Sequence, residues 1–264
     1  MTETTDGRDA REAERANRTF WDADADAYQA QHAEQFEREA CAWGVWGIPE
    51  SQLGVLGPTR DLDVLELGCG SAQWAVGLAL AGARVVGLDL SVGQLRHARA
   101  RVERARVRVP LVLASATATP FTSESFDLVF CDHGAMSFCD PAHTVPEVAR
   151  LLRPGGRLVF NCTTRLLYWT YDAERDRQGR KLVAGAFDRR RWCFEEGTID
   201  FAVSDGEWLR RFAANGLVAL DLVELRAPKG ATTTFTEFAP YELARDWPLE
   251  QIWVVEKPAA TASR

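Results

Sequence analysis

The sequence predicts an α/β fold, a parallel sheet covered by helices on both faces. From residue 61 onward, short apolar segments of strand length alternate with helical segments. This alternation is typical of parallel sheets, because each crossover helix packs back onto the sheet. A glycine-rich turn between the first strand and the first helix of this region indicates a ligand site at the carboxyl edge of the sheet.

Seven segments have the length and apolar content of strands: 64–67, 84–88, 110–114, 126–131, 157–161, 217–225 and 251–256. Helices are expected over 8–40, 50–57, 71–80 and 143–152. Two further helices should begin at Ser91-Val92-Gly93-Gln94 and Ser204-Asp205-Gly206-Glu207, because Ser followed three residues later by Gln or Glu forms a capping box. Arg153-Pro154-Gly155-Gly156 is expected to be the turn before the fifth strand.

Composition limits the classes of function. The chain has 264 residues and a net charge of −7, which argues against nonspecific nucleic-acid binding through Lys and Arg. The longest apolar run, 74–83, is half the roughly 20 residues that a membrane helix needs. The polar start and the lack of a Cys-x-x-Cys pair among six cysteines favour a cytoplasmic protein with reduced thiols.

The strongest local signal is the turn Gly68-Cys69-Gly70 at the end of the first strand of the sheet. Glycines allow positive φ and let a ligand approach the backbone, and the helix that follows presents free N–H groups. Asp89 ends the next strand, about 20 residues on, where a carboxylate can accept hydrogen bonds from two ribose hydroxyls. Together these features predict an adenosine-type ligand.

A dinucleotide-binding fold would share the glycines and the acid. It would usually carry a third glycine where this chain has Gln73, and its loop would hold a pyrophosphate. Glu66 places a negative charge two residues before Gly68, which disfavours a pyrophosphate and favours an ammonium or sulfonium ligand. A nicotinamide-dependent oxidoreductase is therefore the weaker alternative.

Four motifs follow one another between residues 61 and 161. They are Glu66-Leu67-Gly68-Cys69-Gly70, then Gly87-Leu88-Asp89-Leu90-Ser91, then Pro120-Phe121 with Ser125-Phe126-Asp127, then Leu152-Arg153-Pro154-Gly155-Gly156. In order and spacing, this region resembles the class I S-adenosylmethionine (SAM)-dependent methyltransferases, of the type that acts on small molecules. The resemblance implies SAM as cofactor and a seven-stranded sheet whose last strand is antiparallel.

The resemblance also implies cofactor contacts. Gly68, Cys69 and Gly70 would face the methionine part of SAM, with Glu66 beneath. Asp89 would bind the ribose hydroxyls and Leu90 would flank the adenine. Ser115 and Ala116 stand where the family often has Asp beside the adenine amino group, so that contact is weaker here or comes from the backbone. Cys131 and the three residues after it would lie near the sulfonium and its methyl group.

As a single domain, the chain would divide into four parts: an N-terminal helical lid (1–60), a SAM-binding half (61–161), a substrate-cap insertion (162–200), and the last strands and helix (201–258). In the lid, Tyr28 would donate to the SAM carboxylate, while Trp46 with Trp21 and Trp43 would close over the acceptor. The alternative is an amphipathic helix that only packs on the domain. A metal is not expected, since no second acid precedes Asn161 at the end of the fifth strand.

His133 is the candidate general base, because it follows the fourth strand and its ordinary pKa suits neutral pH. The alternative is a loop histidine that only bonds to backbone. Asp132 would orient His133 or shape the SAM pocket, or it is an ordinary loop acid. In the insertion, Tyr168 and Trp169 belong to a cluster of aromatic residues that suits a flat or apolar acceptor. Its other members are Tyr171, Phe187, Trp192 and Phe194. They could equally form the core of a small cap.

The sequence therefore predicts methyl transfer from SAM to a small, aromatic or apolar acceptor by in-line displacement. A base is needed only if the nucleophile must lose a proton. Two alternatives stay open: a methyltransferase that acts on RNA or protein, and a SAM-binding protein without turnover. We expect no nucleic-acid or membrane partner, and a monomer or homodimer.

Overall fold

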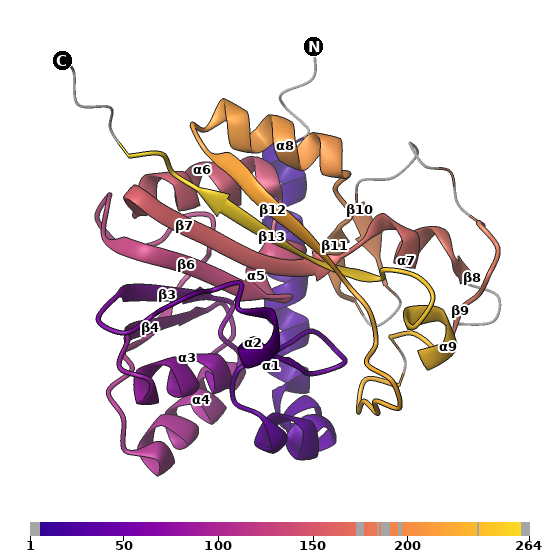
Figure 1. Cartoon of the computed structure of the whole chain (residues 1–264), viewed down its shortest axis with the longest axis horizontal. Coiled ribbons are helices and arrows are strands. Elements are labelled where there is room, and N and C mark those ends of the chain that lie inside the picture. Colours follow the sequence, from indigo (N-terminus) through magenta and orange to yellow (C-terminus); the bar gives the residue numbers. More distant parts are fainter. Residues whose placement is uncertain are drawn as a thin grey trace.

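The computed structural model describes residues 6–172, 177–183, 185, 191–194, 197–236 and 238–259, with side chains from residue 10. A seven-stranded sheet in the order β12-β13-β7-β6-β3-β4-β5 forms its centre (Figure 1). Its strands are β3 (Asp63–Leu67), β4 (Arg84–Asp89), β5 (Leu111–Leu113), β6 (Phe126–Asp132), β7 (Leu152–Thr163), β12 (Val218–Leu225) and β13 (Glu250–Glu256). β13 is antiparallel to both neighbours, and the other pairs are parallel. The predicted fold class is confirmed.

Two hydrophobic cores lie on the two faces of this sheet. Val64, Leu128 and Phe130 belong to one core, and their chain neighbours Leu65 and Val129 belong to the other. The strands are therefore apolar on both faces, as strands buried between two helical layers are. Figure 1 shows α3 (Gln73–Leu80) and α4 (Val92–Ala105) on one side, and α6 (Pro141–Leu151) and α8 (Asp205–Ala214) on the other.

The capping boxes placed the starts of two helices correctly. The Ser91 side chain accepts from the Gln94 N–H at the start of α4, and that of Ser204 accepts from the Glu207 N–H at the start of α8. α6 begins two residues earlier than predicted, because Asp140 caps it and Pro141 suits its first turn.

Three predicted boundaries were wrong. The expected helix over 50–57 is only α2 (Glu50–Leu53), because Gly54 at φ +65° ends it. The helix expected from Ser71 begins at Gln73, since Ala72 still has a left-handed turn conformation. Residues 153–156 lie within β7 as an irregularity in its pairing, where Leu152 pairs with Phe126 and Arg157 with Leu128.

The remaining elements had no periodic signal. They are β1 (Ala42–Trp43), β2 (Ile48–Pro49), α5 (Gly134–Phe138), α7 (Arg165–Trp169), β8 (Tyr171–Asp172), β9 (Arg177–Gln178), β10 (Arg191–Cys193), β11 (Ile199–Phe201) and α9 (Tyr241–Ala244). Figure 1 shows α7, β8, β9 and α9 gathered at one end of the molecule. Among the described residues, no helix combines the length and apolar character needed to cross a bilayer.

The helix α1 (Asp6–Arg38) passes the carboxyl ends of the parallel strands (Figure 1). Its Asp22 carboxylate accepts from the Ser91 hydroxyl at 2.7 Å and from the Gly93 N–H at 3.1 Å, just after β4. Glu14 accepts from the Ser115 hydroxyl at 2.9 Å, after β5. α1 therefore covers the edge at which the sequence places the ligand site.

Asn17 fixes α1 to the sheet domain and offers a test of this docking. Its buried amide donates to the carbonyls of Phe138 and Ile199 and accepts from the Ile199 N–H. Asn17→Ala removes all three bonds and leaves buried backbone groups unpaired, so we expect a loss of about 3 kcal/mol in the free energy of unfolding. Arg18→Ala, at an exposed ion pair one residue on, should cost less than about 0.5 kcal/mol. Urea denaturation of both variants measures the difference, and equal stabilities would contradict it.

Candidate functional site

The glycine turn after β3 is tied to the end of β4. The N–H groups of Gly68 and Cys69 both donate to the Leu88 carbonyl, at 2.8 and 2.9 Å. The Asp89 carboxylate accepts from the N–H groups of Gly70 and Ser91, both at 2.8 Å. Gly68 and Gly70 have φ of +71° and +49°, which favours glycine. The structure thus brings together the turn and the acid that the sequence singled out.

Two buried carboxylates flank this turn. Glu66 accepts from the Ala75 N–H at 2.9 Å, in the first turn of α3. Burial raises its pKa well above the usual range, and the charges of Asp132 and Asp89 add to the effect. Burial also raises the pKa of Asp89, against the lowering effect of its backbone hydrogen bonds. A cationic ligand group at this edge would relieve both carboxylates.

The loops after β3 and β6 are in direct contact. A Cβ added to Gly68 would lie 2.6 Å from the Ala135 nitrogen, and one added to Gly134 would lie 2.7 Å from the Gly68 oxygen. His133, directly before Gly134, has a φ of +60°, a backbone conformation that costs free energy in residues other than glycine. Cys131, just before this loop, is buried, and its sulfur accepts from the Met136 N–H.

A polar network joins β6, β7 and β13 at the same edge. The Asn161 amide donates to Asp132 Oδ1 at 2.8 Å and to Glu250 Oε1 at 3.2 Å. The turn between β1 and β2 completes the network, since the Gly44 N–H donates to Asp132 and the Val45 N–H to Glu250. Asp132 is thus held by backbone and amide donors. Burial raises its pKa, although the nearby His133 lowers it.

His133 is hydrogen-bonded to Glu250, with 2.6 Å between Nε2 and Oε1. Burial lowers the pKa of His133, but the hydrogen bond and charge of Glu250, with the charges of Asp132 and Asp200, outweigh burial and raise it. Glu250 was missed in the sequence, because only β13 and the antiparallel pairing bring it to this edge. A glutamate two residues before the apolar run 252–255 was the available signal.

Aromatic residues between β12 and β13 face α1 and His133. His32 stacks on Phe235 with ring centres 3.8 Å apart, and Tyr28 contacts His32 at 4.6 Å. Phe238 lies 5.9 Å from the His133 ring, and Tyr241 lies 5.7 Å from Trp46, which is buried. This segment, 226–249, was not among the expected covers of the site, although Phe235, Phe238 and Tyr241 recur every third residue.

In the insertion, Tyr168 and Trp169 have different surroundings. The Tyr168 hydroxyl is buried, lies 2.7 Å from the Thr163 hydroxyl and donates to Asp200 at 2.9 Å. Its ring stacks on Trp192, while Trp169 lies under the Arg165 guanidinium. Tyr168 therefore links α7 to β7 and β11. Phe187 lies outside the described residues.

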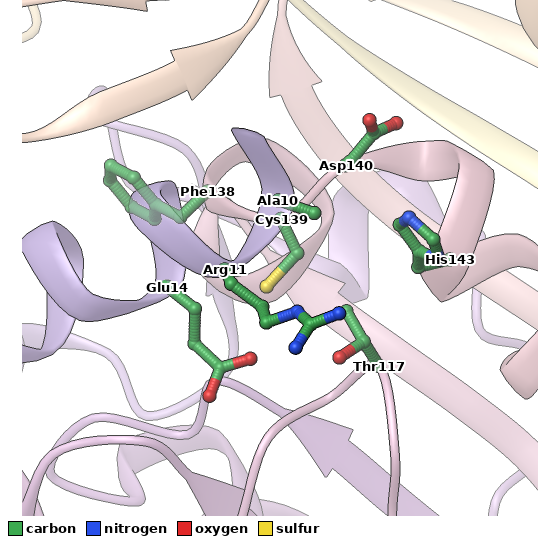
Figure 2. A pocket seen from close by; sticks show the side chains of 8 residues that line it. All are labelled: Ala10, Arg11, Glu14, Thr117, Phe138, Cys139, Asp140 and His143. Atoms are coloured by element: carbon green, nitrogen blue, oxygen red, sulfur yellow. The ribbon is translucent and has the colours of Figure 1, made fainter. Parts of the chain in front are cut away.

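A cavity of about 190 Å³ lies between α1 and the loops that follow β5 and α5. Figure 2 shows Arg11 of α1 reaching toward Thr117 there. Ser115 and the buried Ala116 precede Thr117, and Leu90, after β4, is partly exposed. Among the residues described, no group of three or more His, Cys, Asp or Glu side chains is placed to hold a metal ion. The lining residues are Ala10, Arg11, Glu14, Thr117, Phe138, Cys139, Asp140 and His143.

Comparisons with known proteins agree with this geometry. Residues 65–160 match the family model described as methyltransferase domain. A demethylmenaquinone methyltransferase from Mycobacterium sp. (strain KMS) is 44% identical over 96 residues, which cover 36% of this chain and 39% of the relative. The match thus spans well under half of that relative.

Two solved structures share the fold at low identity. The 1,6-didemethyltoxoflavin-N1-methyltransferase of Burkholderia thailandensis, solved with 1,6-didemethyltoxoflavin and S-adenosylhomocysteine, has a TM-score of 0.61 and 14% identity, over 95% of this chain and 90% of that chain. The cyclase SpnF has a TM-score of 0.65 and 17% identity, over 92% of this chain and 95% of that chain.

Two glycines in a left-handed conformation, Gly68 and Gly54, offer a test of the contact between the loops after β3 and β6. Gly68→Ala adds backbone strain and a clash with the loop after β6, so we expect a loss of about 2–5 kcal/mol in the free energy of unfolding. Gly54→Ala, at φ +65° with open space around it, should lose only about 1 kcal/mol from strain. Thermal and urea unfolding compare the two. Similar losses would show that the loops do not pack as described.

Proposed function

We propose that this chain, whose residues 65–160 match a methyltransferase domain, transfers a methyl group from SAM to a small, aromatic or apolar acceptor. One observation carries the proposal. Glu66 and Asp89 are buried at the ends of adjoining strands, on either side of the Gly68-Gly70 turn. This arrangement combines an acceptor for ribose hydroxyls with negative charge for a sulfonium.

The residues present fit SAM. Each carboxylate oxygen of Asp89 accepts one of the backbone N–H groups described above, and an ionised carboxylate has about four acceptor sites, so ribose hydroxyls could still bind. Gly68 and Gly70 would take the methionine part, with Glu66 beneath. Leu90, Ser115 and Ala116 would border the adenine, and Tyr28 of α1 would approach the SAM carboxylate. When bound, SAM supplies a methyl group already activated on sulfur.

The chain's own contribution is alignment and proton removal. α1 and the β1–β2 turn, which Asp132 and Glu250 hold in place, cover the carboxyl edge and would exclude water from the reacting groups. Alignment of nucleophile and methyl group is itself a large part of such catalysis. Where the nucleophile must lose a proton, His133 would accept it, with Asp132 shaping its surroundings.

The aromatic surroundings favour a flat, apolar acceptor. Phe238 beside His133, together with Trp46 and Tyr241, would supply ring surface for the acceptor, and Trp169 of the insertion would add to it. The curated relative is named for a quinone-type acceptor, demethylmenaquinone, which has this character. The net charge of −7 and the aromatic surroundings favour such an acceptor over RNA.

A SAM-binding protein without methyl transfer is the second candidate. The fold likeness to a cyclase favours keeping it, since a shared fold does not imply a shared reaction. Transfer of labelled methyl from SAM into an extract of the source cell separates the candidates. Label in small molecules supports the first, label in RNA or protein indicates a macromolecular acceptor, and binding without label supports the second.

Asp89→Ala should weaken SAM binding at least about 100-fold. The substitution removes the ribose acceptor and also frees the N–H groups of Gly70 and Ser91 that shape the turn. Isothermal titration calorimetry measures the change. Asp221→Ala, at an exposed position of β12, is the matched control and should bind as the wild type does. Undiminished binding by Asp89→Ala would rule out SAM at this edge.

His133→Ala should lower turnover by about 100-fold or more while SAM affinity stays nearly unchanged, because a general base acts only in the reaction step. The steady-state rate with an identified acceptor, and calorimetry on the same sample, check the two halves of the expectation. His97→Ala, on α4 and paired with the exposed Asp26 carboxylate, serves as control. Normal turnover in His133→Ala would reduce His133 to a loop residue.

A further inference from the structure

We infer that Glu250 is a positioning residue for His133, holding the hydrogen of the neutral ring on Nε2 and leaving Nδ1 as the nitrogen that takes a proton. The inference rests on the proposed function for its role in the reaction. The pairing of the two side chains stands on the geometry alone.

The hydrogen-bond partners of Glu250 decide the tautomer. Its Oε1 atom accepts from the Val45 N–H at 2.9 Å and from the Asn161 amide at 3.2 Å, and neither group can act as acceptor at those atoms. As a carboxylate oxygen, Oε1 carries no hydrogen of its own and accepts from His133 Nε2 as well, at 2.6 Å. Nε2 must carry hydrogen, so in the neutral ring Nδ1 has the free lone pair.

The Glu250 carboxylate has little freedom to move. The residue is 2% exposed, begins β13 and pairs with Thr163 of β7. A Cβ added to Gly44 would overlap Glu250 Oε1, so the β1–β2 turn closes directly over the carboxylate. The His133 side chain is 23% exposed, and its Nδ1 has no hydrogen-bond partner among the described residues. One ring nitrogen is thus fixed and the other is available.

This arrangement provides a place for the proton that the methyl transfer releases. The acceptor X–H bond breaks and its proton goes to Nδ1. The electron pair of that bond forms the X–CH₃ bond while the C–S bond breaks, and the C–S pair stays on sulfur. The resulting imidazolium faces the carboxylates of Glu250 on β13, Asp132 on β6 and Asp200 on β11. Their charges stabilise it until the proton leaves for solvent.

Histidine NMR tests the pairing without any acceptor. The full chain has four histidines, so ¹⁵N labelling of their rings gives a small set of signals, and His133→Gln assigns the one in question. In the wild type we expect the neutral ring of His133 to carry its hydrogen on Nε2, with a pKa above the usual value. Glu250→Gln keeps the shape but removes the charge, and should lower that pKa by about 1 pH unit or more.

Two further variants supply a control for charge and a test of the position of the carboxylate. Glu256→Gln, at the other end of β13, should leave the His133 pKa unchanged. Gly44→Ala keeps the charge of Glu250 but displaces its carboxylate, and should also lower the pKa. A neutral ring with its hydrogen on Nδ1, or equal pKa values in Glu250→Gln and Glu256→Gln, would overturn the inference.

Enzyme kinetics then test the role in the reaction. With an identified acceptor, Glu250→Gln should lower kcat about 10-fold or more and move the acid limb of the pH profile to lower pH, with KM and SAM affinity nearly unchanged. A purely structural role would leave the position of that limb unchanged and would overturn the inference. Failure of the wild type to bind SAM would instead refute the proposed function, since the NMR result does not depend on it.

Discussion

The burial of carboxylates at the carboxyl edge of the sheet is the constraint on which the site depends. Glu66, Asp89 and Glu250 are all at most 8% exposed, and each is satisfied by at least one backbone N–H group. Those N–H groups belong to the glycine turn, the first turn of α3 and the β1–β2 turn. Satisfying the buried charges therefore fixes the loops as well, because an unpaired buried carboxylate would cost several kcal/mol. The positions of the site residues and of the loops around them thus both follow from the need to pair these buried carboxylates.

This constraint has a cost in stability. The pKa values of Glu66 and Asp89 are raised in the folded chain, so the folded state holds protons that the unfolded state has released. For a carboxyl group with a raised pKa, the stabilising contribution is present at low pH and is lost as pH rises through the folded value. Loss of the protons that Glu66 and Asp89 retain in the folded chain therefore lowers stability as pH rises. A cationic ligand group would offset that loss, which couples ligand charge to stability.

How far the sequence predicts the site depends on how local each signal is. The glycine turn, Asp89 and both capping serines lie within single strand–turn–helix units, so spacing along the chain was enough to place them. The His133–Glu250 pair joins residues 117 positions apart, and the β1–β2 turn that covers Glu250 lies 205 positions from it. No periodicity links such segments, because only the order of strands in the sheet brings them together. The irregular pairing of β7 at 153–156 was missed for a related reason, since its glycines and proline are typical of a turn.

The long helix α1 joins the two halves of the candidate site. Its 33 residues span about 50 Å, enough to cross the whole edge of the sheet. The first half bonds through Asn17 to α5 and β11 and through Asp22 to the start of α4, and the second half places Tyr28 and His32 against Phe235. An α-helix is stiff along its length, because its backbone hydrogen bonds resist bending unless a proline or glycine interrupts them. Residues 8–38 contain neither. One stiff helix therefore holds both the loops after β4 and β5 and the aromatic segment 226–249, so the packing of these distant parts of the chain depends on a single element.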